Sequence, residues 1–167
     1  VVLTLIDRHA KGLEVINDWD GFGQRTTSSG TISLNQVEID PFLIFDERLL
    51  STQTNYRGAF SQLMQVAIDV GIAEAAFADT LTAVQKARPI IDAQVEHARF
   101  EHYTLQEIGK SNVMLDAAIL LLDDAAEYLD ELDALEHITD EQAAKASILV
   151  AEAKVYANDA ALHISEK

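Results

Sequence analysis

The sequence predicts an α+β fold that is mainly α-helical, in which a partial antiparallel β domain is followed by an up-down helical bundle. Up to about residue 45, apolar and polar residues alternate in short runs that are separated by turn-forming residues, which is typical of strands. From about residue 54 the chain changes to long runs with apolar residues at three- and four-residue steps, which is typical of amphipathic helices. We therefore expect a partial β domain at residues 1–45 and a helical bundle at residues 46–167.

The first part of the chain contains runs that predict three or four strands. Pro41 lacks a backbone donor, and a proline biases the residue before it away from helix. The sheet is therefore expected to end near Asp40. The strand-like runs are residues 2–5, 13–16 and 31–39.

The second part of the chain predicts three long helices. The first helix is expected to run from about residue 54 until Pro89 stops it. Each of the other two helices is expected to begin with a capping box, in which a hydroxyl and the side chain three residues later each accept a hydrogen bond from the other residue's backbone. The second helix is expected to begin at Thr104 with Glu107, and the third at Thr139 with Gln142. Helices of about 30 residues, roughly 45 Å long, exceed what an isolated three-helix domain needs. We therefore expect a fourth helix or other subunits to complete the bundle.

Composition excludes several classes of function. The formal net charge of -16 disfavours nucleic acid and anionic membranes as partners. The absence of cysteine excludes disulfides and thiolate metal sites. The apolar residues 1–6 are followed at once by Asp7 and Arg8, so they are read as a strand and as neither a signal peptide nor a membrane span. A cytoplasmic location is the expectation.

Residue motifs alone identify no catalytic residue and no metal site. His97, Glu101 and His102 match no strong metal-binding spacing, and we interpret them as a solvated polar face. The acidic pairs of the second helical run are interpreted in the same way. The serines and glycines match neither a nucleophile elbow nor a phosphate-binding loop.

Three segments together carry a resemblance that covers nearly the whole chain. They are residues 19–30 (WDGFGQRTTSSG) with the alternating run to Pro41, residues 87–91 (ARPII) with 103–109 (YTLQEIG), and residues 158–165 (NDAALHIS). In order and spacing these segments resemble the acyl-CoA dehydrogenase fold superfamily. The residues of these segments are most similar to the branch of this superfamily that contains dibenzothiophene monooxygenase and the sulfur-acquisition oxidoreductases.

The resemblance implies a flavoprotein whose β domain and C-terminal helical bundle hold a flavin together and which assembles as a homotetramer. It implies that this chain is the second half of the β domain followed by most of an acyl-CoA dehydrogenase-like C-terminal domain, truncated at its end. The parent would be an oxidoreductase that receives reduced FMN, or alternatively FAD, from a separate flavin reductase and oxygenates organosulfur or related compounds. The chain alone is expected to bind no flavin, because the site needs both the β domain and the bundle and the upstream half of the β domain is absent. It is expected to be inactive, because the catalytic residues of this branch match no position in it.

The resemblance assigns two cofactor-binding residues to this chain. Trp19 matches a tryptophan that lines the flavin pocket, although a core aromatic in a turn would look the same. Arg88 matches an arginine that closes the first bundle helix and reaches a flavin phosphate, a task that suits a planar guanidinium. An arginine that only stabilises a helix C-terminus by its charge is the other interpretation.

Two alternatives to the monooxygenase stay open at this point: an acyl-CoA dehydrogenase and a non-catalytic helical interaction module. Some acyl-CoA dehydrogenases carry their catalytic glutamate at the position of Ser61, which Gln62 follows, so this chain has no base there. Others place it elsewhere, so dehydrogenation is disfavoured without being excluded. A homo-oligomer, dimer or tetramer, is expected through the helical bundle because the apolar helix faces cannot all be covered within three helices. Neither the substrate nor the choice between FMN and FAD follows from the sequence.

Overall fold

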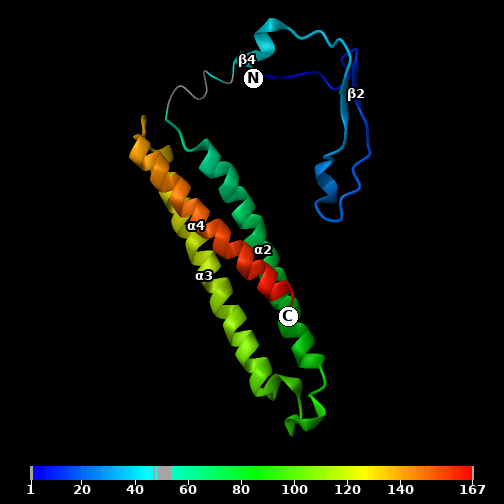
Figure 1. Cartoon of the computed structure of the whole chain (residues 1–167), viewed down its shortest axis with the longest axis vertical. Coiled ribbons are helices and arrows are strands. Elements are labelled where there is room, and N and C mark those ends of the chain that lie inside the picture. Colours follow the sequence, from blue (N-terminus) through cyan, green and yellow to red (C-terminus); the bar gives the residue numbers. More distant parts are fainter. Residues whose placement is uncertain (1, 47, 49–53, 167) are drawn as a thin grey trace. The chain divides into compact units, whose positions relative to one another are not determined.

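A computed structural model describes residues 2–46, 48 and 54–166 of the chain. It divides into two compact units, Val1–Gln53 and Thr54–Lys167. The first unit contains short strands and the second contains three long helices (Figure 1). The predicted α+β, mainly α fold class is confirmed.

The first unit consists of two antiparallel strand pairs. β1 pairs with β4, placing Leu3 opposite Phe45, and β2 pairs with β3, placing Glu14 opposite Ser33. None of the described residues of this unit is buried. Because two-stranded pairs are marginally stable alone, the apolar faces of these strands need a further covering layer. The strands are β1 Val2–Thr4, β2 Leu13–Val15, β3 Ile32–Leu34 and β4 Ile44–Asp46, with 3-10 turns at Arg25–Thr27 and Pro41–Leu43.

Two predictions about the strands were wrong. The sheet does not end near Asp40, because Pro41 opens a single 3-10 turn after which β4 returns to pair with β1. The Asp40 carboxylate caps that turn by accepting a hydrogen bond from Phe42 N at 2.9 Å. The alternating run from residue 31 forms a strand only at Ile32–Leu34, because Gln36 has a left-handed φ of 50° that breaks the extended conformation.

The second unit is an up-down-up arrangement of three helices, which confirms the predicted bundle (Figure 1). The helices are α2 Arg57–Lys86, α3 His102–Asp133 and α4 Asp140–Ser165. α4 packs against both α2 and α3. Two 3-10 turns, Ile91–Ala93 and Ala98–Phe100, lie in the connection between α2 and α3. No helix within the described residues is long and apolar enough to span a membrane.

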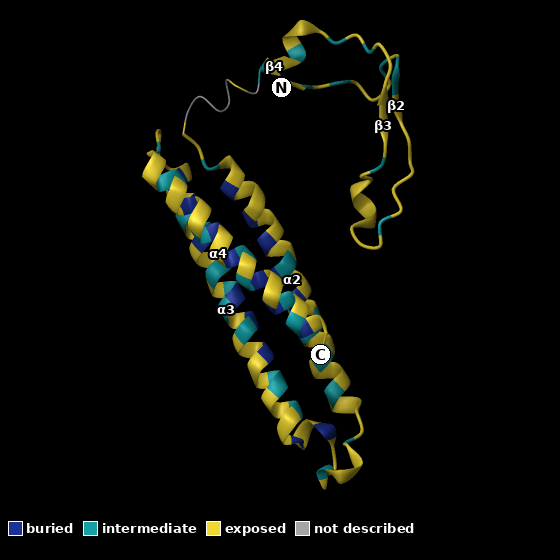
Figure 2. Ribbon diagram, in the orientation of Figure 1, coloured by how far each residue is buried: buried dark blue, intermediate teal, exposed yellow. Residues whose placement is uncertain are grey.

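The core of the helical unit combines branched residues on α2 and leucines on α3 with alanines on α4 (Figure 2). Val66, Leu129 and Leu132 are buried side chains of this core. Alanine at the α4 contact positions leaves room for the neighbouring backbones to approach closely. The fully buried alanines of α4 are Ala146, Ala153, Ala157 and Ala160.

The two predicted capping boxes have different outcomes. The box that opens α4 is confirmed: the Thr139 hydroxyl accepts from Gln142 N at 3.2 Å, and the Gln142 side chain accepts from Thr139 N at 2.8 Å. The box at Thr104 was wrong, since α3 begins at His102 and the Thr104 hydroxyl instead donates to Glu101 at 3.0 Å. The carboxylate of Glu101, three residues before Thr104, thus takes the place of the predicted Glu107.

Candidate functional site

Trp19 lies in the loop between β2 and β3, and its indole is held by the loop itself. Its Nε1 donates a hydrogen bond to the backbone carbonyl of Gln24 at 3.0 Å. Gln24 adopts a left-handed backbone with φ 48°, which turns the chain back under the ring. The side chain is 37% exposed, in a unit in which no described residue is buried. Part of the indole surface is therefore open to a ligand.

Arg88 lies beyond the end of α2 and not in its last turn as predicted. α2 ends at Lys86, and Ala87 already has an extended backbone with ψ 144°. Pro89 adds to this ending, because a proline disfavours helix in the residue before it, which is Arg88. Lys86 is consequently the basic residue of the last turn. The helix-end interpretation of Arg88 loses its main support, because the dipole effect falls off within that turn.

The Arg88 side chain is exposed, and within the described part of the chain it makes no hydrogen bond or ion pair, so its donors are open to an anion. Trp19 belongs to the first compact unit and Arg88 to the second. Each candidate side chain is therefore accessible within its own unit.

The connection that carries Arg88 is anchored by a buried carboxylate that sequence patterns missed. Glu101 is only 8% exposed. One of its carboxylate oxygens accepts from Ile90 N at 2.5 Å and the other from the Thr104 hydroxyl at 3.0 Å. The prediction that Glu101 belongs to a solvated face was wrong, because the backbone donor after Pro89 draws it inward. This bond fixes the chain two residues after Arg88.

A pocket of about 370 Å³ lies against the same connection. Its wall is mostly apolar and includes Ile90, Val95 and Phe100, with Glu101 and His102 among its polar members. Because both Glu101 oxygens already accept hydrogen bonds, the carboxylate serves the connection rather than a ligand. Among the residues that the structure describes, no group of three or more His, Asp or Glu side chains could hold a metal ion.

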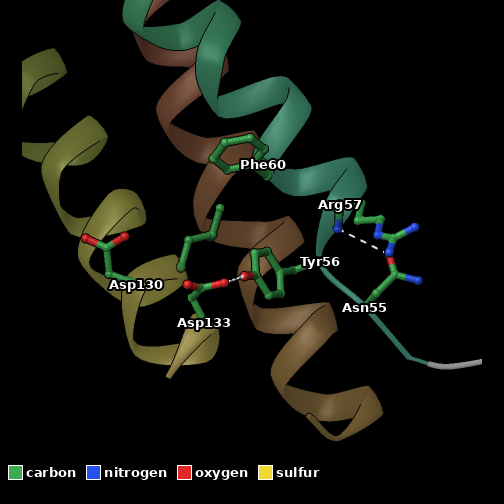
Figure 3. A pocket seen from close by; sticks show the side chains of 7 residues that line it. Asn55, Tyr56, Arg57, Phe60, Asp130 and Asp133 are labelled. Atoms are coloured by element: carbon green, nitrogen blue, oxygen red, sulfur yellow. Dashed lines mark hydrogen bonds between the residues drawn. The ribbon is translucent and has the colours of Figure 1, made fainter. Parts of the chain in front are cut away.

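A larger pocket of about 550 Å³ lies where α2 begins and α3 ends (Figure 3). The Tyr56 side chain points toward Asp133, and its hydroxyl donates to the Asp133 carboxylate at 2.6 Å. Phe60 and Leu129 supply apolar wall, and Asp130 lies beside Asp133. The two partners of this contact are 77 residues apart, so no local sequence pattern predicted it.

Tyr56 links the start of α2 to the end of α3 and is unsuited to proton transfer. Its pKa is raised above the ordinary 10.0, first because its hydroxyl donates to the Asp133 carboxylate, then because of burial and the charges of Asp133 and Asp130. A phenol with a raised pKa stays protonated at neutral pH and is a poor general acid or base there. The Thr54 hydroxyl also donates to Asp140 at 2.5 Å, so two bonds join the entry of α2 to the region between α3 and α4.

We expect the helical unit to lose stability above pH 10 through Tyr56. A folded-state pKa above the unfolded value means that the contribution of the group is fully present below pH 10.0 and is lost as pH rises through the raised value. Tyr56→Phe removes this loss. Urea unfolding of both proteins at about pH 8 and about pH 11 should show a smaller drop between the two pH values for Tyr56→Phe.

The matched control is Tyr103→Phe, which removes a hydroxyl from an exposed tyrosine. It should keep the alkaline loss of the wild-type chain. An equal drop for Tyr56→Phe and the wild type would contradict the assigned role of the Tyr56–Asp133 bond.

Comparison with known proteins places this architecture in a family. The model of the acyl-CoA dehydrogenase C-terminal domain matches residues 63–166. That match covers more than half of the chain, and it spans α3 and α4 with most of α2. The chain belongs to the acyl-CoA dehydrogenase C-terminal domain family.

Several of the similar proteins are monooxygenases. The chain is 29% identical over 171 residues to the probable FMNH2-dependent monooxygenase SfnC of Pseudomonas putida, covering 100% of this chain and 43% of the relative. It is 28% identical over 180 residues to dibenzothiophene monooxygenase of Mycolicibacterium goodii, covering 100% of this chain and 42% of the relative. The crystal structure of TdsC from Paenibacillus sp. A11-2 with FMN and indole superposes with a TM-score of 0.87 at 26% identity, over 95% of this chain and 42% of TdsC. The predicted resemblance is confirmed, and the chain spans less than half the length of these relatives.

Proposed function

We propose that this chain is part of a flavin-dependent monooxygenase that uses reduced FMN to oxygenate organosulfur or related compounds. The observation that carries the proposal is the similarity to an FMNH2-dependent monooxygenase and to dibenzothiophene monooxygenase along the full length of this chain. Because the chain spans 43% and 42% of those relatives, the activity is assigned to a longer protein that contains these residues. This chain alone is expected to hold no flavin and to show no turnover. The location we propose is the cytoplasm.

The residues present are suited to a flavin. The exposed guanidinium of Arg88 can bond two phosphate oxygens at once, and Glu101 holds the backbone just after it. The partly exposed indole of Trp19 offers an apolar wall for a ring system. When bound, reduced flavin supplies the electrons that activate molecular oxygen. In this proposal Arg88 holds the phosphate and Trp19 lines the ring pocket.

Dehydrogenation is the runner-up, and α2 argues against it. The position where some acyl-CoA dehydrogenases carry a glutamate holds Ser61 and Gln62, which lie in the first turns of α2. Gln62 accepts a hydrogen bond from Lys154 of α4, so its side chain is used in helix packing. An amide in a packing contact cannot abstract a proton from a substrate.

The longer protein that contains these residues tests the proposal directly. With a flavin reductase, NADH as its electron donor, FMN, oxygen and dibenzothiophene, we expect oxygenated product that disappears when the reductase, NADH or oxygen is left out. An acyl-CoA that bleaches the bound oxidised flavin under anaerobic conditions would instead establish dehydrogenation. Repeating both assays with FAD separates the two cofactors, and activity with FAD alone would overturn the FMN assignment.

We propose a homo-oligomer, a dimer or tetramer, formed through the helical bundle. α2 exposes Phe60, Met64, Ile68 and Ile72 at steps of four residues, each at least 50% exposed. α4 exposes Ile148, Val155 and Leu162 at steps of seven. Apolar residues aligned along two helix faces are typical of surfaces that pack against further helices.

We expect this chain to sediment as an oligomer, and Ile148→Glu with Val155→Glu to shift it toward the monomer. Each carboxylate would have to be buried without a partner in a helix interface. Ser147→Glu is a control that adds a carboxylate at an exposed α4 position outside this apolar stripe, because residue 147 is neither three nor four residues from Ile148 or Val155. A wild-type chain that sediments as a monomer at high concentration and high salt would contradict the proposal.

A further inference from the structure

Asp18, the residue before Trp19, joins the two sides of the loop that carries the indole. One Asp18 carboxylate oxygen accepts a hydrogen bond from Thr31 N and the other from the Thr31 hydroxyl, both at 2.7 Å. Ile16 N also donates to the carbonyl of Thr31 at 2.9 Å. Three hydrogen bonds thus converge on Thr31 from the chain just before Trp19, where β2 and β3 separate.

Where these hydrogen bonds join the two sides of the loop, the chain segments approach so closely that position 30 requires a glycine. A Cβ atom on Gly30 would lie 2.5 Å from Asp18 Oδ1, 2.8 Å from the carbonyl oxygen of Ile16 and 3.3 Å from Trp19 N. Two of these neighbours are backbone atoms that cannot move aside without shifting the loop. The backbone at Trp19 is therefore held against residue 30, immediately beside Thr31.

The indole is restrained from its other side as well. A Cβ atom on Gly21 would lie 2.3 Å from Cζ2 of the Trp19 ring, so the ring lies directly over that residue. Its Nε1 is bonded to the carbonyl of Gln24. With the backbone held at Asp18 and the ring held at positions 21 and 24, one orientation of the side chain is favoured.

We infer that Asp18 and Thr31 are positioning residues for Trp19, and that their paired hydrogen bonds give the indole the orientation in which it lines a flavin pocket. The flavin part of this inference rests on the proposed function, whereas the positioning part does not. The Thr31 hydroxyl and amide also lower the pKa of Asp18 below its ordinary value, so the carboxylate is charged at neutral pH and accepts both bonds. Two charge-assisted hydrogen bonds to one residue restrain geometry more than a single neutral one.

The chain contains a single tryptophan, so its fluorescence reports on Trp19 alone. We expect Thr31→Val, which removes the hydroxyl but keeps the branched shape and the backbone donor, to increase acrylamide quenching and lower the emission anisotropy. Asp18→Ala, which removes both bonds, should raise the quenching constant by about twofold, because a released indole approaches full exposure. Thr31→Ser restores the hydroxyl and should return both signals to the wild-type values.

Thr26→Val is the matched control, because Thr26 is an exposed threonine of the same loop that takes no part in the closure. It should leave quenching and anisotropy unchanged. The urea-unfolded chain gives the quenching limit of a free indole, so an intermediate value for Thr31→Val distinguishes local release from unfolding of the first unit. Wild-type quenching and anisotropy in both Asp18→Ala and Thr31→Val would overturn the inference.

A second measurement separates the positioning role from the flavin assignment. In the longer protein, FMN is titrated into the wild type, Thr31→Val and Thr26→Val while the visible flavin spectrum is followed. Weaker binding or an altered spectrum in Thr31→Val alone supports the whole inference. Increased quenching with unchanged flavin binding overturns only the flavin part, and unchanged quenching overturns the positioning role whatever the flavin shows.

Discussion

Leu132→Ala is expected to lower the free energy of unfolding of the helical unit by about 2–5 kcal/mol. Leu132 is 2% exposed and belongs to the core shared by the three helices. The substitution removes buried methyl groups and leaves a cavity. Several neighbours in that core are alanines, which have no side-chain rotamers with which to fill the space. The loss is therefore expected toward the upper part of the range.

Leu120→Ala makes the same chemical change on the same helix at a side chain that is 68% exposed. It should cost no more than about 0.5 kcal/mol, because no buried contact is lost. Urea unfolding followed by helical circular dichroism measures both variants, with equal slopes required for the comparison. Similar losses for the two substitutions would show that Leu132 is not part of a closed core.

Local patterns predicted the helices well because the residues that determine each helix lie within that helix or next to it. The apolar spacing of α2 and the capping box at Thr139 involve residues a few positions apart, so they can be read from the sequence. Pairing between distant segments cannot be read in this way. β4 forms because Ile44–Asp46 pairs with β1, some forty residues earlier in the chain. For this reason the prediction that the sheet ends near Pro41 was wrong.

The candidate site shows the same division between local and distant information. The end of α2 near Arg88 followed from Pro89, but Glu101 was taken for a solvated residue because its partner Ile90 N is eleven positions away. The Tyr56–Asp133 bond was missed for the same reason. Hydrogen bonds between residues this far apart follow no spacing rule, so local patterns could predict neither contact.

Arg88→Ala is expected to weaken flavin binding by about ten- to a hundredfold in the longer protein that contains this chain, since a charge-assisted hydrogen bond contributes roughly 1.5–3 kcal/mol. The prediction rests on the proposal that Arg88 holds the flavin phosphate. The exposed guanidinium follows α2 directly, and the Glu101 bond to Ile90 N fixes the backbone beyond it. Arg88→Lys should recover only part of the affinity, because an ammonium keeps the charge but loses the planar pair of donors.

Lys86→Ala is the control that separates phosphate binding from charge at the helix end. Lys86 lies in the last turn of α2, where a cation stabilises the helix terminus, whereas Arg88 lies after the extended Ala87. Lys86→Ala should therefore lower stability by less than about 1 kcal/mol and leave flavin affinity unchanged. If Arg88 acted only through charge near this terminus, Arg88→Ala would behave like Lys86→Ala. Flavin titration of the four proteins decides between these outcomes, and equal affinities in all of them would remove Arg88 from the flavin site.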